Sequence, residues 1–208
     1  EGETGRQKTA TASVDKYLVK KAADIVQLFE PPFDKSSVNP GYIKGYVPGG
    51  RENGGQYTHA AIWLVMAYAA MGNNEKVWEL IQMINPINHG SDAETINEYK
   101  IEPYVIAADV YGVPLHKGRG GWSWYTGSAG WMYQLIIESF IGLKKEGNSL
   151  HFVPHVPANW KSFTIAYRFM DTTYHITINQ KKNNGTIEKL LLDGIEQPTK
   201  FIPLNNDG

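Results

Sequence analysis

Apolar residues follow two different patterns in the middle of this chain. From Ala60 to Met71 no residue is charged and apolar side chains point in every direction of a helix, which predicts a helix buried on all sides. Gly72 is suited to end this helix. Residues 73–84 instead place apolar and charged side chains on opposite faces, which predicts an amphipathic outer helix. Its apolar face consists of Val77, Leu80, Ile81 and Ile84.

Two later segments are also almost wholly apolar. Residues 102–111 have a proline suited to the first turn of a helix and are otherwise apolar except for Asp109. Residues 128–142 contain one internal acid, Glu138. We therefore expect helices buried on both sides, mixed with at least one amphipathic helix. Two concentric helical layers, as in an (α/α) barrel, would produce this combination.

Beyond Gly147 the apolar residues alternate with polar ones, and β-branched residues become frequent, as in strands. Turn sequences such as KNNG and DG separate these runs. The pattern predicts about five antiparallel strands, and a domain boundary near residue 147. The expected strand segments are 150–154, 163–169, 172–179, 186–194 and 196–204.

The first part of the chain has weaker patterns. Residues 1–12 are polar and lack periodicity, so we expect a loose terminus. Ser13 could cap a short helix over residues 14–22, and residues 25–29 form a strand-like run. A loop over residues 32–56 follows, and loops of this length are usually functional or disordered.

Composition narrows the classes of function. With 42% hydrophobic and 20% charged residues, the 208-residue chain can form a sizeable core. A net charge of −1 gives no basic surface for nucleic acid or acidic lipid. The absence of cysteine excludes disulfides and thiol chemistry, which fits a cytoplasmic protein without excluding a periplasmic one. The histidines show no metal-ligand spacing, so we expect no metal. The six tryptophans and twelve tyrosines serve the core or stack on sugar rings.

A dense polar cluster, RENGGQYTH (51–59), stands directly before the apolar helix. One interpretation is that these residues cap the helix and hold the loop, with Thr58 as the N-cap. The other is a binding pocket, because a helix N-terminus presents free N–H groups and a positive dipole end. His59 could then donate to an anion or to a sugar hydroxyl.

The run GRGGWSWYTGSAGWMY (118–133) repeats this arrangement. Small residues over 126–130 open a helix and would let an anion approach the backbone N–H groups. Tight helix packing against small residues is the alternative. The run lacks the Gly-Lys-Ser/Thr signature of a P-loop, so no nucleotide is implied. Trp122, Trp124 and Tyr125 would form an aromatic wall beside the anion, and an anion beside aromatic rings suggests a sugar and a phosphate.

Carboxylates are less informative. Glu52, Glu102, Asp109 and Glu138 are candidates for acid–base chemistry, but no spacing identifies the pair that an ordinary glycosidase needs. Asp109 and Glu138, on apolar segments, are expected to be structural groups or to support neighbouring residues of a site.

Five stretches carry a resemblance to a known family over roughly residues 13–180: GYIKGYVPGGRENGGQYTHAAIW (41–63), YKIEPYVIAADVY (99–111), GRGGWSWYTGSAGWMY (118–133), PPFD (31–34) and PHVPANWKSFTIAYR (154–168). They resemble the C-terminal region of glycoside hydrolase family 94, in the version found in cyclic β-1,2-glucan synthases. The resemblance implies an α+β fold in which the C-terminal part of an (α/α)6 barrel (13–147) precedes an antiparallel, jelly-roll-like β-sandwich cap (148–208).

The same resemblance implies a chemistry. The better-known members are inverting phosphorylases, in which inorganic phosphate, a co-substrate rather than a cofactor, attacks the anomeric carbon. His59, Thr126 and Gly127 would contact phosphate, and Glu52 the acceptor-side sugar. The remaining expected sugar-binding residues are Arg51, Asn53, Gln56, Tyr57, Trp124 and Tyr125.

The family's general acid, an Asp within an aromatic-acidic motif on an earlier barrel helix, has no counterpart here, so no catalytic residue is assigned. We therefore expect a fragment that is inactive alone and that self-associates or binds the rest of its own polypeptide. The full protein would act on β-glucan in the cytoplasm. The resemblance to cyclic glucan synthases, which are inner-membrane proteins, implies that this region faces the cytosol. A non-catalytic carbohydrate-binding module and a purely structural cap domain are the alternatives.

Overall fold

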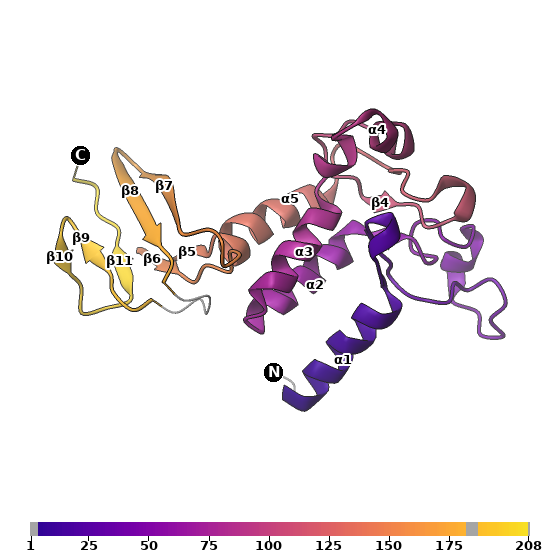
Figure 1. The fold of residues 1–208 in the computed structure, drawn as a ribbon, viewed down its shortest axis with the longest axis horizontal. Helices are drawn as coiled ribbons and strands as arrows, with labels where there is room; N and C mark the ends of the chain where they lie inside the picture. The colour runs from indigo at the N-terminus through magenta and orange to yellow at the C-terminus, as the bar shows by residue number, and fades with distance from the viewer. Residues whose placement is uncertain (1–3, 182–186, 208) are drawn as a thin grey trace. The chain divides into compact units, whose positions relative to one another are not determined.

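The computed structural model describes residues 4–181 and 187–207, which divide into two compact units. The first unit comprises the described residues up to Leu64 together with Leu80–Met132, and the second comprises Val65–Glu79 with the described residues from Tyr133. The helices are α1 (Thr4–Tyr17), α2 (Thr58–Ala70), α3 (Asn74–Ile84), α4 (Ala93–Tyr99) and α5 (Gly127–Gln134), which continues into a π-helical turn over Leu135–Phe140 (Figure 1). None of the described helices combines the length and the apolarity that a membrane span requires.

Strands of the first unit are short. They are β1 (Val19–Lys20), β2 (Ile25–Val26), β3 (Gln56–Tyr57) and β4 (Asp109–Val110). β1 pairs antiparallel with β2, and β3 pairs antiparallel with β4. The core beside them contains Ile25, Tyr99, Ala107 and Val110, so β2, β4 and the end of α4 bury their apolar side chains together.

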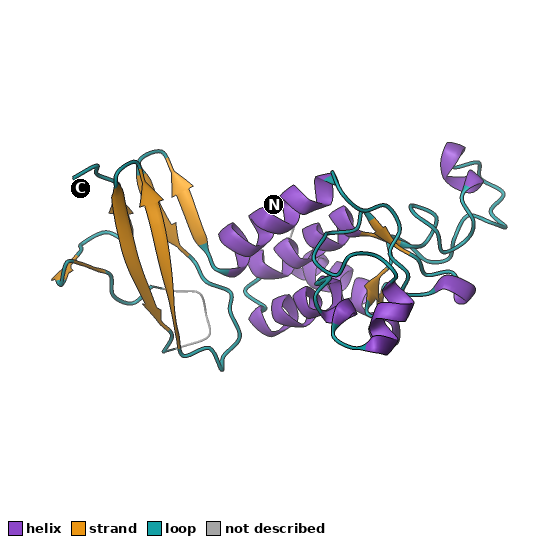
Figure 2. Ribbon diagram, turned by 90° about the horizontal axis from the view of Figure 1, so that it is seen from above, coloured by secondary structure: helices purple, strands orange, loops and turns teal. Residues whose placement is uncertain are grey.

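The second unit contains both short and longer strands, drawn in orange like all strands in Figure 2. They are β5 (Leu143–Glu146), β6 (Ser149–Phe152), β7 (Ser162–Phe169), β8 (Thr172–Asn179), β9 (Leu191–Leu192), β10 (Ile195–Glu196) and β11 (Phe201–Pro203). Strands β11, β6 and β5 form one antiparallel sheet in that order, and β7 and β8 form a hairpin. Apolar side chains of the hairpin pack against a cluster of Leu143, Leu150, Phe152, Ile202 and Leu204, so the two sheets share one core.

The α+β class and the antiparallel strands are confirmed. The change from helix to strand, expected near residue 147, occurs at β5, which begins at Leu143. The amphipathic helix over 73–84 is confirmed as α3, with its predicted apolar face buried. The KNNG turn lies outside the described residues.

The prediction of a helix buried on all sides over residues 60–71 is right about the helix and wrong about the burial. In α2, Ala61, Ile62 and Val65 are buried, but Trp63 is 52% exposed and Ala67 is exposed. Gly72, at φ 71°, ends the helix as predicted, because Gly72 N–H and the next N–H donate back to carbonyls of the last turn. The apolar outer side of α2 has no cover within the described part of the chain.

Two predictions of secondary structure are wrong. Residues 4–12 are helical, and Ser13 lies inside α1, where its hydroxyl donates to the Thr9 carbonyl at 2.9 Å instead of capping a new helix. Residues 102–111 contain turns and β4 rather than a helix. Their backbone groups bond to β3 and to residues 118–122, and this pairing overrides the apolar pattern.

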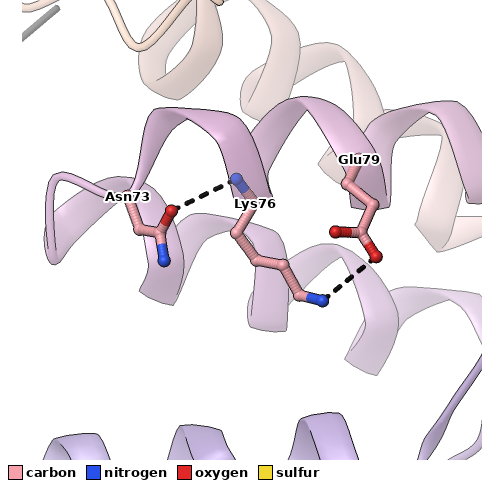
Figure 3. A network of polar contacts seen from close by, with 3 residues as sticks. All are labelled: Asn73, Lys76 and Glu79. Atoms are coloured by element: carbon pink, nitrogen blue, oxygen red, sulfur yellow. Dashed lines mark hydrogen bonds and ion pairs between the residues drawn. The ribbon is translucent and has the colours of Figure 1, made fainter.

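Asn73 caps α3 (Figure 3). Its side-chain oxygen accepts from the Lys76 N–H at 3.2 Å, and the Lys76 ammonium lies 3.2 Å from Glu79 Oε1, one turn further along. The cap satisfies one of the N–H groups that the first turn of a helix leaves without a carbonyl partner.

We expect Asn73→Ala to lower the free energy of unfolding by about 1 kcal/mol, because the Lys76 N–H loses its partner. Chemical denaturation followed by circular dichroism measures the change. Asn73→Asp keeps an accepting oxygen and is expected to stay within about 0.5 kcal/mol of the parent. An equal loss in both variants would contradict the capping role.

Candidate functional site

The starts of α2 and α5 are both attached to one short segment of the first unit, residues 106–109. The Thr58 N–H donates to the Ala108 carbonyl at 2.9 Å. The Thr126 hydroxyl donates to the Ile106 carbonyl at 2.9 Å, and the Ser128 hydroxyl donates to the Ala107 carbonyl at 3.3 Å. Successive carbonyls of one segment therefore fix the two helix starts relative to each other.

His59, in the first turn of α2, lies among aromatic rings. Its ring centroid is 4.6 Å from that of Trp63 and 5.2 Å from that of Trp131, and its ring lies nearly parallel to Tyr57. The His59 Nε2 atom is buried and has no hydrogen-bond partner among the described residues. A buried ring nitrogen without a partner costs free energy, so this atom is suited to a ligand oxygen that would supply the missing bond.

Thr126 is the N-cap of α5. Besides donating to Ile106, its hydroxyl accepts from the Ala129 N–H at 3.2 Å. The hydroxyl proton is therefore committed to the protein. The first N–H groups of α5, those of Gly127 and Ser128, are the donors that a helix start leaves for an anion. Gly127 is exposed, and a Cβ added there would meet no atom within 4 Å.

Two predicted sugar-binding residues, Asn53 in the loop before β3 and Gln56 at the start of β3, have side chains that are turned inward. Asn53 is fully buried, accepting from the Phe33 N–H and donating to the Tyr46 carbonyl, both at 2.8 Å. Gln56 is 1% exposed and accepts from the Val26 N–H at 2.8 Å. The Asn53 side chain holds the long loop in place and the Gln56 side chain ties β3 to β2, as in the capping and loop interpretation of this cluster.

Arg51, Glu52 and Tyr57 are more accessible. The Arg51 guanidinium lies over the Tyr46 ring at 5.4 Å, and its Nε is 3.8 Å from Glu52 Oε2. That Glu52 oxygen is itself buried without a hydrogen-bond partner within residues 4–181 and 187–207. A sugar hydroxyl could donate to it.

Asp109 is the deepest acid of this region, 2% exposed. Its Oδ1 accepts from the Trp122 N–H at 3.1 Å, while Oδ2 has no hydrogen-bond partner in the described ranges. Burial raises the pKa of Asp109, although the Trp122 N–H and the charge of Arg51 act in the opposite direction. The bond to Trp122 fits the structural role expected for this residue. Glu138, the other acid expected to be structural, accepts from the Gln134 amide at 3.0 Å.

Residues 118–126, which we call the aromatic loop, turn sharply before α5. Trp124 and Tyr125 both adopt a positive φ, 63° and 52°, and Trp124 is 49% exposed while Tyr125 is fully exposed. In the sequence, Glu102 was a candidate for acid–base chemistry only, yet both of its carboxylate oxygens bond to this loop. No spacing signal revealed this, because the partners are 21 and 22 residues away. The part of the chain that the structure describes contains no group of three or more potential metal ligands.

Comparison with known proteins gives consistent matches. The profile of the glycosyl hydrolase 94 superfamily, catalytic domain, matches residues 1–142. The chain is 43% identical over 185 residues to the cyclic beta-(1,2)-glucan synthase NdvB of Rhizobium meliloti (strain 1021), covering 89% of this chain and 6% of that protein. It is 26% identical to the solabiose phosphorylase of Paenibacillus borealis, covering 86% of this chain and 23% of that protein. It is 28% identical to the 1,2-beta-oligoglucan phosphorylase of Listeria innocua, covering 52% of this chain and 11% of that protein. The chain thus spans less than a quarter of the length of each of these relatives.

We expect Asn53→Ala to lower the free energy of unfolding by about 1 to 2 kcal/mol, because it leaves two partly buried backbone groups, the Phe33 N–H and the Tyr46 carbonyl, without their partner. Urea denaturation gives the energy, and the hydrogen-exchange rate of the Phe33 amide tests the local cause. Asn39→Ala, which removes an exposed bond to the Gly41 N–H, is the matched control and is expected to cost less than about 0.5 kcal/mol. A Phe33 amide that stays protected in Asn53→Ala would contradict this assignment.

Asp109 gives a prediction about pH. Folding raises the pKa of the Asp109 carboxyl, so the folded chain holds the carboxyl proton more tightly than the unfolded chain does. Ionisation of Asp109 therefore lowers the free energy of unfolding as pH rises through the ordinary pKa of an aspartate, about 3.9. Asp109→Asn keeps an oxygen for the Trp122 N–H and removes the charge. We expect it to raise the melting temperature at pH 7 and to change it less at pH 3. A larger gain at pH 3 than at pH 7 would show that the sign is wrong.

Proposed function

Because the chain belongs to the glycosyl hydrolase 94 superfamily, we propose that it is the C-terminal part of a larger phosphorylase-like enzyme acting on β-linked glucan. The family resemblance of the sequence motifs is confirmed by these matches. A β-1,2 linkage is favoured because two of the relatives are named for glucans of that linkage. The small share of each relative that the chain covers supports the proposal of a fragment.

The reaction we propose is inverting phosphorolysis. A phosphate oxygen attacks the anomeric carbon, the glycosidic bond breaks, and a carboxylic acid gives its proton to the leaving sugar oxygen. The products are a sugar 1-phosphate and a shortened glucan. Phosphate takes the place of the base-activated water of an inverting hydrolase, so one acid suffices. That acid is proposed to lie in another part of the enzyme, which leaves binding as the role of this chain and makes the chain inactive alone.

One observation carries the proposal: residues 106–108 hold the starts of α2 and α5 together. Two helix N-termini add their positive dipole ends and free N–H groups, which stabilises a bound anion. We place phosphate against His59 Nε2 and the Gly127 N–H. Thr126 contributes as the cap that fixes the start of α5, because its hydroxyl proton is already donated to Ile106.

On the sugar side we propose contacts with Arg51, Glu52, Tyr57, Trp124 and Tyr125. Glu52 would accept from a sugar hydroxyl on the acceptor side, and the exposed rings of the aromatic loop would stack on the apolar face of a glucose ring. Asn53 and Gln56 are proposed to shape the site through the loop that they hold.

The larger architecture is also a proposal. The uncovered outer side of α2, which includes Trp63, would face further helices of an (α/α)6 barrel. The β11-β6-β5 sheet and the β7-β8 hairpin of the second unit would form a jelly-roll-like β-sandwich cap. Without those helices, the exposed apolar side chains favour self-association.

A second candidate is a carbohydrate-binding module without catalysis, which the exposed Trp122, Trp124 and Tyr125 favour. Such a module would bind glucan equally well with and without phosphate. Calorimetric titration with glucan, in the presence and in the absence of phosphate, distinguishes a binding module from a phosphorylase.

In the complete enzyme, we expect His59→Ala to raise the KM for phosphate about tenfold, which corresponds to about 1.4 kcal/mol, the size of one hydrogen bond to a charged group. The KM for the glucan is expected to change less than threefold. Initial rates at varied phosphate and varied glucan give both constants. His116→Ala, which removes an exposed histidine of the same unit, is the control. Equal increases in both KM values would contradict the phosphate role.

A further inference from the structure

Glu102 holds the aromatic loop with both of its carboxylate oxygens. Oε1 accepts from the Trp124 indole Nε1–H at 3.0 Å, and Oε2 accepts from the Ser123 hydroxyl at 3.2 Å. Hydrogen bonds hold the pKa of Glu102 below its usual value. The bond from Trp124 contributes most, and bonds from the Glu102 backbone N–H and from Ser123 add to it. The group is therefore a carboxylate at neutral pH. Bonds to an ionised acceptor are stronger than bonds between neutral groups.

The turn held in this way is one that non-glycine residues rarely adopt. Trp124 and Tyr125, which follow each other, both lie in the left-handed region, where the Cβ crowds the backbone. Such a conformation persists only where surrounding contacts over-determine it. The Glu102 bonds are two of these contacts. The Trp122 indole N–H, which donates to the Trp124 carbonyl at 3.1 Å, and the edge-to-face contact of Trp124 with Tyr104 are two more.

The turn determines where the aromatic rings point. With Trp124 half-exposed and Tyr125 fully exposed, it presents two large apolar surfaces to solvent, against the normal tendency of such rings to be buried. The start of α5 does not depend on Glu102, because Thr126 and Ser128 are bonded separately to Ile106 and Ala107. Glu102 therefore holds the Ser123–Trp124 part of the loop, while residues 106–109 hold Trp122 and the start of α5.

We infer that Glu102 is a positioning residue for the sugar: by holding Trp124 and Ser123, it fixes the left-handed turn that presents Trp124 and Tyr125 to a glucose ring of the acceptor. The inference rests on the proposed function. In this role Glu102 acts on the sugar through the loop, by its bonds to Trp124 and Ser123. Its removal affects sugar binding and leaves phosphate binding unchanged.

The test compares Glu102→Ala, Trp124→Phe and the double variant in the complete enzyme, with KM for phosphate and for β-1,2-gluco-oligosaccharide as the readouts. Trp124→Phe keeps an apolar ring but removes the N–H donor. Each single variant is expected to raise the KM for the sugar about tenfold and to leave the KM for phosphate within about twofold. The double variant is expected to add little to either single change, because both remove the same bond.

Two further variants complete the design. Glu102→Gln keeps an oxygen for the Trp124 N–H, so its KM for the sugar is expected to stay within about threefold of the parent. It also keeps the inference testable if Glu102→Ala fails to fold. Glu94→Ala removes an exposed acid of α4 as the matched control, and is expected to change neither constant.

The outcomes separate the inference from the proposed function. Equal effects on both KM values, no effect on either, or additive effects in the double variant would overturn the positioning role of Glu102 alone. An unaltered enzyme that does not phosphorolyse glucan would overturn the proposed function, and the inference with it.

Discussion

The site depends on the backbone hydrogen bonds of residues 106–109. Carbonyls of this segment accept from the starts of α2 and α5, and the Ala108 N–H donates to the Trp122 carbonyl at 2.7 Å. Every helix start leaves N–H groups without partners, and here two such starts are fixed to one rigid segment. The pairing of β3 with β4 supports the segment, because it joins Tyr57 to Asp109 directly before α2 begins. Without this segment neither the anion donors nor the aromatic loop would have a fixed position.

This arrangement concentrates unfavourable features at one place. The side chain of Asp109, an ionisable group, is buried. His59 Nε2 and a Glu52 oxygen are buried without hydrogen-bond partners in the described part of the chain. Two residues of the aromatic loop have a positive φ. Other buried polar side chains are paired: Asn53 bonds to two backbone groups, and Gln56 bonds to the Val26 N–H and to the Thr58 hydroxyl. Strain and unpaired polar atoms that gather in one region are typical of binding sites, where a ligand supplies the missing bonds.

The sequence predicted the parts of the fold that depend on local periodicity. The amphipathic pattern located α3, the change to period two located the antiparallel strands, and the glycine after α2 marked its end. It failed for residues 102–111, because an apolar run with a proline near its start does not reveal that its backbone will pair with segments far away in the chain. It also could not show whether another element covers Trp63, since periodicity gives the faces of a helix and not its neighbours.

The candidate site was predicted to a similar extent. The clusters at 51–59 and 118–133 were identified from residue types alone, and the structure attaches both to residues 106–109. The roles of single side chains were harder to predict. Asn53 and Gln56 look the same in the sequence as Glu52, yet they face inward to backbone partners. The contact of Glu102 with Trp124 depends on a turn that no residue pattern encodes.

The central claim is that the two helix starts bind one phosphate ion. A crystal structure of the complete enzyme with phosphate bound tests it most directly. Phosphate oxygens are expected within hydrogen-bond distance of both His59 Nε2 and the Gly127 N–H. Phosphate bound elsewhere, with neither atom in contact, would contradict it.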